Sequence, residues 1–187
     1  MQDEKLRERL DARTSIYNGH VINLEKWDVT LPNGKPAMRE MAIHKGASAI
    51  VPVDDEGYVY LVRQFRTPLQ RVLTEVPAGK LDSAGEDHLV AAKRELHEET
   101  GFTAKKWTHL VDLATTPGFC TETISLYLAE GLTRGETDFD DDEFLDLVRM
   151  PLNEAVRTAL TGGFEDAKTI AALLLAAHAR KGEGAPC

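Results

Sequence analysis

The sequence predicts an α+β domain in which mixed β-sheets are layered between helices, an α/β/α sandwich. Two segments with strand-like alternation, 47–53 and 58–65, are separated by turn residues. An amphipathic helix is expected at about 86–100, and two further helices close the chain. Mixed strands with few helices are typical of an α+β layered architecture.

The elements follow in order from turn residues and periodicity. Residues 14–44 are expected to form strands interrupted by a turn at Pro32-Asn33-Gly34. These strands are expected to form an N-terminal antiparallel segment that precedes the main domain. Asp54–Gly57 then joins the two alternating segments as a hairpin. The later strands are expected near 108–114, 123–130 and 143–150, and the closing helices after Pro151, with Asn153 as cap, and from about Asp166 to His178.

Length and composition set the organisation of the chain. At 187 residues it can form one domain with a substantial core. We expect an N-terminal β segment at 1–45, the main domain at 46–180 and a flexible tail at 181–187.

Charge and apolar content exclude several classes of partner. The 22 Lys and Arg residues against 31 Asp and Glu give a net charge of −9, so nucleic acid is not an expected partner. The charged start lacks the apolar core of a signal peptide, and the longest apolar run, 170–177, is far too short to cross a membrane. Two cysteines, one at the last position, form no disulfide framework, which favours the reducing cytoplasm.

Three glutamates share one turn of the 86–100 helix. At about 100° per residue, Glu95 and Glu99 point the same way, and Glu98 lies about 60° to one side of Glu95. Such carboxylates repel one another, so we expect bound cations to neutralise the cluster. Carboxylate oxygens are ligands that suit Mg²⁺ or Mn²⁺. The alternative is a solvated helix face, on which a glutamate usually has a Lys or Arg four residues further on. Arg94 can pair with Glu98, but the residue four positions after Glu95 is another glutamate, Glu99, which disfavours this alternative.

The residues around this helix closely resemble the Nudix box, the signature of hydrolases that cleave nucleoside diphosphates linked to another group. The matching positions are Gly79, Glu86, Arg94-Glu95-Leu96, Glu98-Glu99 and Gly101-Phe102. One departure lies upstream, where six residues, 80–85, separate Gly79 from Glu86 in place of the usual five. The extra residue fits a surface turn and leaves the metal-binding glutamates untouched.

The resemblance implies a Nudix fold and a role for each box residue. Glu95 and Glu99 resemble the main metal ligands, and Glu98 a further ligand or catalytic partner. The Ala78 carbonyl is expected to complete a coordination sphere, and Arg94 to orient the glutamates by ion pairing. Two to three Mg²⁺ or Mn²⁺ ions per site are expected.

The substrate is suggested by residues outside the box. Pro117, sixteen positions after Gly101, the PAGK run before the box and the run 166–169 are similar to bacterial ADP-ribose pyrophosphatases. The resemblance implies hydrolysis of ADP-ribose to AMP and ribose 5-phosphate. Two alternatives stay open: a pyrophosphatase for a GDP-hexose or UDP-sugar, and a non-catalytic nucleotide-sensing module.

Contacts to the substrate are expected from two arginines and an aromatic ring. Arg39 and Arg66 are candidate phosphate ligands, because the planar guanidinium suits phosphate oxygens. Trp27 is either an adenine platform or a strand residue at a dimer contact, or both. The resemblance implies a homodimer, in which the N-terminal segment contributes to the site.

The general base is expected in the acidic segment 136–143, which is otherwise typical of a solvated loop. Glu143 is the first candidate and Asp142 the second, because the family takes its base from a loop in this region. Glu122, in the loop with Pro117, is a candidate for binding a metal or a substrate hydroxyl.

Overall fold

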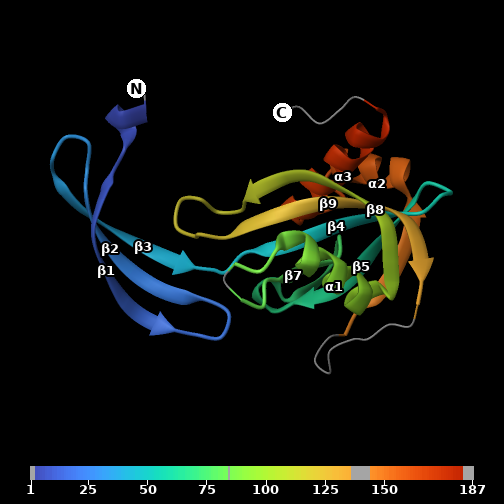
Figure 1. Cartoon of the computed structure of the whole chain (residues 1–187), viewed down its shortest axis with the longest axis horizontal. Coiled ribbons are helices and arrows are strands. Elements are labelled where there is room, and N and C mark those ends of the chain that lie inside the picture. Colours follow the sequence, from blue (N-terminus) through green and yellow to red (C-terminus); the bar gives the residue numbers. More distant parts are fainter. Residues whose placement is uncertain (1–2, 84, 136–143, 183–187) are drawn as a thin grey trace. The chain divides into compact units, whose positions relative to one another are not determined.

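The computed structural model describes residues 3–83, 85–135 and 144–182. These ranges contain ten strands, three α-helices and two short 3₁₀ helices (Figure 1). The strands are β1 (Arg9–Asn18), β2 (Asn23–Thr30), β3 (Pro36–Ile43), β4 (Ala47–Val53), β5 (Tyr58–Arg66), β6 (Arg71–Glu75), β7 (Ala78–Lys80), β8 (Phe102–Ala114), β9 (Thr123–Arg134) and β10 (Asp146–Pro151). The α-helices are α1 (His88–Thr100), α2 (Leu152–Leu160) and α3 (Ala167–Arg180), and the 3₁₀ helices span Asp3–Leu6 and Thr67–Leu69.

The chain divides into two compact units. The first runs to Gly46 and also includes Ala114–Glu122, and the second comprises Ala47–Leu113 and the chain from Thr123 on. In the first unit, β1, β2 and β3 form an antiparallel sheet in which β2 is central. The loop after β8 joins this unit through Ala42, whose N–H donates to the Phe119 carbonyl at 2.7 Å.

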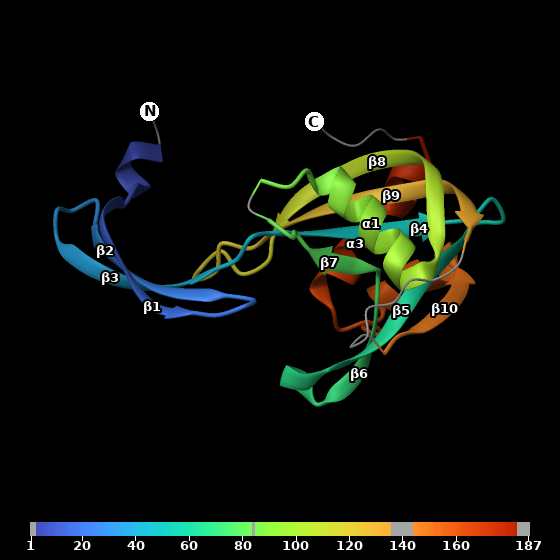
Figure 2. The same cartoon turned by 60° about the horizontal axis from the view of Figure 1, so that its bottom comes forward.

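The second unit is built on a mixed sheet of order β10-β5-β4-β9-β8, with β6 paired to β5 and β7 to β4. Strands β4 and β9 lie parallel at its centre, in register from Ala47 opposite Ile124 to Val53 opposite Glu130. Two neighbouring parallel strands need a long connection. Here that connection, from β4 to β9, contains β5, β6, β7, α1 and β8. Figure 2 shows the β5–β6 hairpin extending from the edge of this sheet.

Helices cover both faces of the central strands, and the side chains of β9 alternate between them. Leu126 and Leu128 join a large core against α2 and α3, whereas Tyr127 and Ala129 pack on the α1 side with Leu96. Figures 1 and 2 show α1 and the α2/α3 pair on different sides of β4 and β9. The predicted α/β/α sandwich of mixed strands, preceded by an antiparallel N-terminal sheet, is therefore confirmed.

Several boundaries differ from the sequence expectation. Residues 14–44 contain a second turn, at 19–22, and the first strand begins earlier, at Arg9. Strands β6 and β7 were not anticipated, because each is too short for a clear alternation and forms only by pairing with β5 and β4. The cap expected at Asn153 is wrong: α2 begins one residue earlier, at Leu152, and Pro151 occupies the N-cap position without a side-chain hydrogen bond.

The predicted apolar run 170–177 lies within α3, where Ala172, Leu173 and Ala176 are buried. Within the described ranges, no helix is long and apolar enough to cross a membrane.

Candidate active site

Helix α1 begins and ends at well-defined caps. The Asp87 carboxylate accepts hydrogen bonds from the N–H groups of Leu89 and Val90, at 2.9 and 3.0 Å. At the other end Gly101 adopts a left-handed conformation, with φ 71°, and its N–H donates to the His97 carbonyl at 2.8 Å. The helix therefore spans 88–100, two residues shorter at its start than the sequence indicated.

Two of the three clustered glutamates are buried. Leu96 on the core side of α1 is fully buried, and the flanking Glu95 and Glu99 are only 6% and 4% exposed. Buried carboxylates require hydrogen-bond donors. Glu99 accepts one from the N–H of Ala78 at 3.1 Å, which ties the helix to β7. Glu98 is partly exposed, as expected for a side chain that points away from the core.

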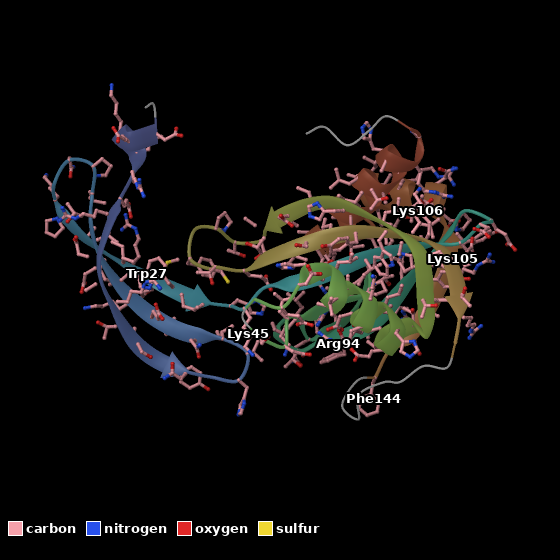
Figure 3. The ribbon with its side chains drawn as sticks, in the orientation of Figure 1. Trp27, Lys45, Arg94, Lys105, Lys106 and Phe144 are labelled. Atoms are coloured by element: carbon pink, nitrogen blue, oxygen red, sulfur yellow. The ribbon has the colours of Figure 1, made fainter. Side chains whose placement is uncertain are left out.

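Arg94 bridges the glutamates. Its Nη1 donates to Glu95 Oε1 at 2.7 Å and to Glu98 Oε2 at 3.0 Å, and its Nη2 donates to the Lys80 carbonyl at 3.1 Å. Burial lowers the pKa of the Arg94 guanidinium, but the charges of Glu95 and Glu98 outweigh this, and the pKa is raised. The predicted ion pair between Arg94 and Glu98 is thus confirmed, and Figure 3 shows Arg94 on α1.

Gly79 is required by a close approach of side chain to backbone. A Cβ built on Gly79 would lie 2.0 Å from Oε1 of Glu95 and 2.1 Å from Oε2. Any side chain at this position would therefore displace the Glu95 carboxylate. Together with the Ala78 hydrogen bond to Glu99, this contact places two consecutive residues of β7 against the two buried glutamates.

Hydrogen bonds tie Glu86 to Asp82 and Ser83 ahead of α1. The Glu86 N–H donates to the Ser83 carbonyl at 3.2 Å, and the Glu86 carboxylate accepts a hydrogen bond from the Asp82 N–H at 2.6 Å. Glu86 Oε1 lies 3.9 Å from Nη2 of Arg94. Glu86 is therefore close to Arg94, which also contacts Glu95 and Glu98, despite the six residues that separate it from Gly79.

The donor set of the box suits a hard divalent cation. Glu95, Glu98 and Glu99 offer only oxygen ligands, and so does the Ala78 carbonyl. The Arg94 Nε lies 3.4 Å from Asp82 Oδ2, so the arginine carries the positive charge that partly balances the clustered carboxylates. Over the ranges the structure describes, no three His, Cys, Asp or Glu side chains are gathered closely enough to form a metal site.

Arg66 is held by a buried carboxylate. Its Nε and Nη2 donate to the two oxygens of Glu75, at 2.7 and 2.8 Å, in the bidentate geometry typical of strong Arg–carboxylate pairs. Hydrogen bonding to Glu75 is the main cause of a raised pKa of Arg66, to which the charge of Glu99 also contributes. The Arg66 side chain remains 39% exposed while its Nε and Nη2 donate to Glu75.

Glu75 is buried, at 1% exposure, and was not among the site residues predicted from the sequence. Lys168 on α3 also donates to it and pairs with Asp166 at 3.0 Å. Burial raises the pKa of the Glu75 carboxyl, but hydrogen bonds and charges from Arg66 and Lys168 outweigh this and lower the pKa to about 2. A sequence signal existed: a lone glutamate between apolar residues in LTEVPAG.

The other predicted substrate contacts lie in the first unit. Trp27 on β2 stands opposite Arg13 of β1 and Arg39 of β3, and paired residues share one face of a sheet. The Arg13 guanidinium lies 4.4 Å from the ring centroid of Trp27, whose Nε1 donates to Glu25 at 2.5 Å. Arg39 pairs with Glu8. The Trp27 ring, labelled in Figure 3, therefore already stacks with the Arg13 guanidinium.

Pro117 and Glu122 belong to the loop after β8, also in the first unit. Pro117 lies in a turn closed by a hydrogen bond from the Cys120 N–H to the Thr116 carbonyl, at 3.0 Å. Glu122 accepts a hydrogen bond from Thr115 Oγ1 at 2.8 Å and lies 3.5 Å from His44 Nδ1. Glu143 and Asp142, the candidate bases, lie outside the described residues.

Comparisons with known proteins agree with the resemblance of residues 79–102 to the Nudix box. The sequence model of the NUDIX domain matches residues 42–173. The chain is 42% identical to the ADP-ribose pyrophosphatase of Bacillus subtilis (strain 168), over 91% of this chain and 92% of that protein. It is 41% identical to the methanol dehydrogenase activator of Bacillus methanolicus, over 90% and 92%. A crystal structure of an ADP compounds hydrolase superposes with a TM-score of 0.82 at 26% identity, over 97% of this chain and 98% of that one.

Proposed function

The chain belongs to the Nudix family, and we propose that it hydrolyses the diphosphate bond of ADP-ribose to AMP and ribose 5-phosphate. The observation that carries the hydrolase assignment is the pair of buried glutamates, Glu95 and Glu99, held against two consecutive backbone positions of β7. The substrate assignment is supported by the 42% identity to the Bacillus subtilis ADP-ribose pyrophosphatase.

Glu95, Glu98 and Glu99, with the Ala78 carbonyl, would hold two to three Mg²⁺ or Mn²⁺ ions. Bound there, these ions would offset the charge of the diphosphate and lower the pKa of a water molecule so that hydroxide is available near neutral pH. Within the protein, Arg94 keeps Glu95 and Glu98 oriented through hydrogen bonds of 2.7 and 3.0 Å.

Two side chains supply the remaining chemistry in this proposal. Arg66, fixed by Glu75 and 39% exposed, donates to a phosphate oxygen of the substrate. Glu143, or Asp142, takes the proton of the attacking water. Positioned general base catalysis typically contributes about 10²–10⁴-fold, so most of the rate gain is assigned to the metal-holding glutamates.

Four residues are proposed as further substrate contacts. Trp27 would stack on the adenine, and Arg39, Pro117 and Glu122 would line the substrate site. Every residue of β1 is exposed, including the large apolar Leu10, Ile16 and Tyr17. A second copy of the chain covering this sheet would bury these side chains, which supports a homodimer in which the N-terminal segment serves both dimerisation and substrate binding.

Two alternative functions stay in view. A GDP-hexose or UDP-sugar pyrophosphatase would use the same box, because the box contacts the diphosphate and the metal ions, not the base. A non-catalytic nucleotide-sensing module is disfavoured because the chain retains Glu95, Glu98 and Glu99. A cytoplasmic location is supported by the two cysteines, of which Cys120 is a free thiol.

A substrate panel tests the function. The purified chain is incubated with Mg²⁺ and ADP-ribose, GDP-mannose or UDP-glucose, and the products are identified by mass; water labelled with ¹⁸O reports which phosphorus is attacked. We expect the highest kcat/KM on ADP-ribose. Faster turnover of a GDP- or UDP-sugar would replace the substrate assignment, and no turnover of any compound would refute the hydrolase assignment.

Replacing Glu99 tests the metal ligands. For Glu99→Gln we expect kcat/KM on ADP-ribose to fall by at least about 100-fold, because even outer partners of metal ligands typically contribute about 10–100-fold. Glu154→Gln, on the exposed surface of α2, is the matched control and should retain full activity. Equal activities of the two variants would exclude Glu99 from the site.

A further inference from the structure

Residues 75–79, EVPAG, run from the last residue of β6 into β7. This segment contacts the start of α3 at its beginning and the glutamates of α1 at its end. Val76 and Pro77 lie outside the strand ladders, and although the Pro77 carbonyl accepts a hydrogen bond from the Ile50 N–H of β4 at 2.9 Å, the N–H of Val76 has its partner on α3.

Thr169 on α3 supplies the contact that the sheet does not. The N–H of Val76 donates to Thr169 Oγ1 at 2.9 Å, and both residues are buried, at 1% and 0% exposure. The hydroxyl in turn donates to Asp166 Oδ2 at 2.6 Å, and the same oxygen accepts the Thr169 N–H at 2.9 Å. The hydroxyl is thus fixed by the N-cap of α3 and presents its lone pair to Val76.

The same segment is fixed a second time, one residue earlier. Glu75 is held by Arg66 on one side and by Lys168 of α3 on the other. Adjacent residues of α3, Lys168 and Thr169, therefore hold adjacent residues of the segment, Glu75 and Val76. A buried, fully paired arrangement of this kind favours one geometry over alternatives.

Two residues after Val76, about 7 Å along an extended chain, the segment reaches the metal-site glutamates. Ala78 donates its N–H to Glu99, and Gly79 leaves the space that the Glu95 carboxylate fills. A shift of the backbone at Val76 would move the Ala78 donor and the Gly79 surface together. Pairing with β4 also fixes Ala78 and Gly79, so the Val76 hydrogen bond would act together with this pairing on the position of both glutamates.

On the basis of the metal site proposed above, we propose that Thr169 is a positioning residue for divalent-cation binding, acting through Val76 and the backbone of Ala78 and Gly79. In the described structure the hydrogen bonds of its hydroxyl go to Val76 and Asp166 and not to a box glutamate. Lys168 supports it by fixing Glu75. Helix α3 is then part of the machinery that shapes the metal site and not only a cover for the sheet.

Mn²⁺ binding to the full chain, without nucleotide, tests this proposal. The Mn²⁺ dissociation constant is measured by electron paramagnetic resonance for the wild type, Thr169→Val and Thr169→Ser. Valine keeps the shape and removes the hydroxyl, and we expect the dissociation constant to rise by about 10-fold. Serine keeps the hydroxyl and should restore an affinity close to that of the wild type.

Loss of stability alone is excluded by a matched variant. Leu173→Ala removes a fully buried side chain from the same helix and from the core cluster that includes Val76, but removes no hydrogen bond to the 75–79 segment. We expect it to lower Tm at least as much as Thr169→Val while leaving the Mn²⁺ dissociation constant unchanged. Should Thr169→Val not fold, Thr169→Ala against Thr169→Ser isolates the same hydroxyl.

The outcomes separate this proposal from the function. Wild-type Mn²⁺ affinity in Thr169→Val, or an equal loss in Leu173→Ala, would overturn the positioning role and leave the hydrolase proposal standing. A wild-type chain that binds no Mn²⁺ would overturn both. Failure to hydrolyse ADP-ribose with the expected Mn²⁺ results would refute only the substrate.

Discussion

Strands β1 and β4 differ in burial at every position. All ten residues of β1 in the first unit are exposed, whereas all seven residues of β4 in the second unit are buried. Strand β4 lies between β5 and β9 with helices on both faces, but in the β1–β2–β3 sheet only Val29 is buried. Hydrophobic burial therefore stabilises the second unit, and the described first unit relies on strand pairing and surface polar contacts.

Those surface contacts are weak. Arg9 donates to Asp11 at 2.8 Å and Thr30 donates to the other Asp11 oxygen at 2.6 Å, all at exposed positions. Exposed ion pairs contribute little, because solvent screens both partners. A three-stranded sheet without its own core gains stability from whatever covers it, which is consistent with the homodimer proposed above.

The largest expected effect comes from matched leucine deletions in the two units. Leu126→Ala removes a fully buried side chain from β9 and should lower the free energy of unfolding by about 2–5 kcal/mol. Leu10→Ala, at a residue 40% exposed on β1, should change it by less than about 0.5 kcal/mol in the monomer. Urea unfolding measures both.

A different pattern would revise the comparison. A loss for Leu10→Ala that approaches that of Leu126→Ala and grows with protein concentration would show that a second copy buries β1. A large loss independent of concentration would instead contradict the assignment of stability to the second unit.

The next effect is the acid stability that Glu75 confers. Its pKa is about 2 in the folded protein against about 4.5 for an unperturbed glutamate, so its stabilising contribution is complete above pH 4.5 and is lost as the pH falls toward 2. A difference of this size corresponds to roughly 3 kcal/mol. In Glu75→Gln, the decline of stability between pH 4.5 and 2 should be shallower, as measured by chemical unfolding across this range.

Asp11 is the matched carboxylate of the first unit. Hydrogen bonds from Thr30 and Arg9 lower its pKa, but the side chain is exposed. Asp11→Asn should leave the acid limb of the stability curve close to that of the wild type. If it flattened this limb as much as Glu75→Gln, burial would not be what distinguishes the two carboxylates.

The smallest expected effect concerns Trp27, the proposed adenine platform. Trp27→Ala should raise KM for ADP-ribose by the equivalent of about 1–3 kcal/mol, since an aromatic–base stack contributes about that much. The Mn²⁺ dissociation constant should not change, because the proposed metal ligands Glu95, Glu98 and Glu99 belong to the second unit. Trp27→Phe retains a ring and should show a smaller rise; an unchanged KM in Trp27→Ala would remove Trp27 from the site.

The site was predictable from sequence where its geometry is local. Helical spacing alone brings Glu95, Glu98 and Glu99 onto one turn and places Arg94 within reach of Glu98, and the structure shows that ion pair. The contacts of Glu75 were not predictable in this way. Its partners Arg66 and Lys168 lie 9 and 93 positions away in the chain, and no local periodicity reports such distances.

The sequence by itself determined the family, the helix that carries the glutamates and the layered α+β class, because these depend on motif spacing and on the periods of helices and strands. Only the tertiary structure decided that β6 and β7 exist, that Gly79 faces the Glu95 carboxylate and that α3 holds the backbone beside the box. The physical reason is that hydrogen-bond partners distant in the chain are chosen by packing, since a buried N–H or carboxylate must find its partner wherever the fold provides one.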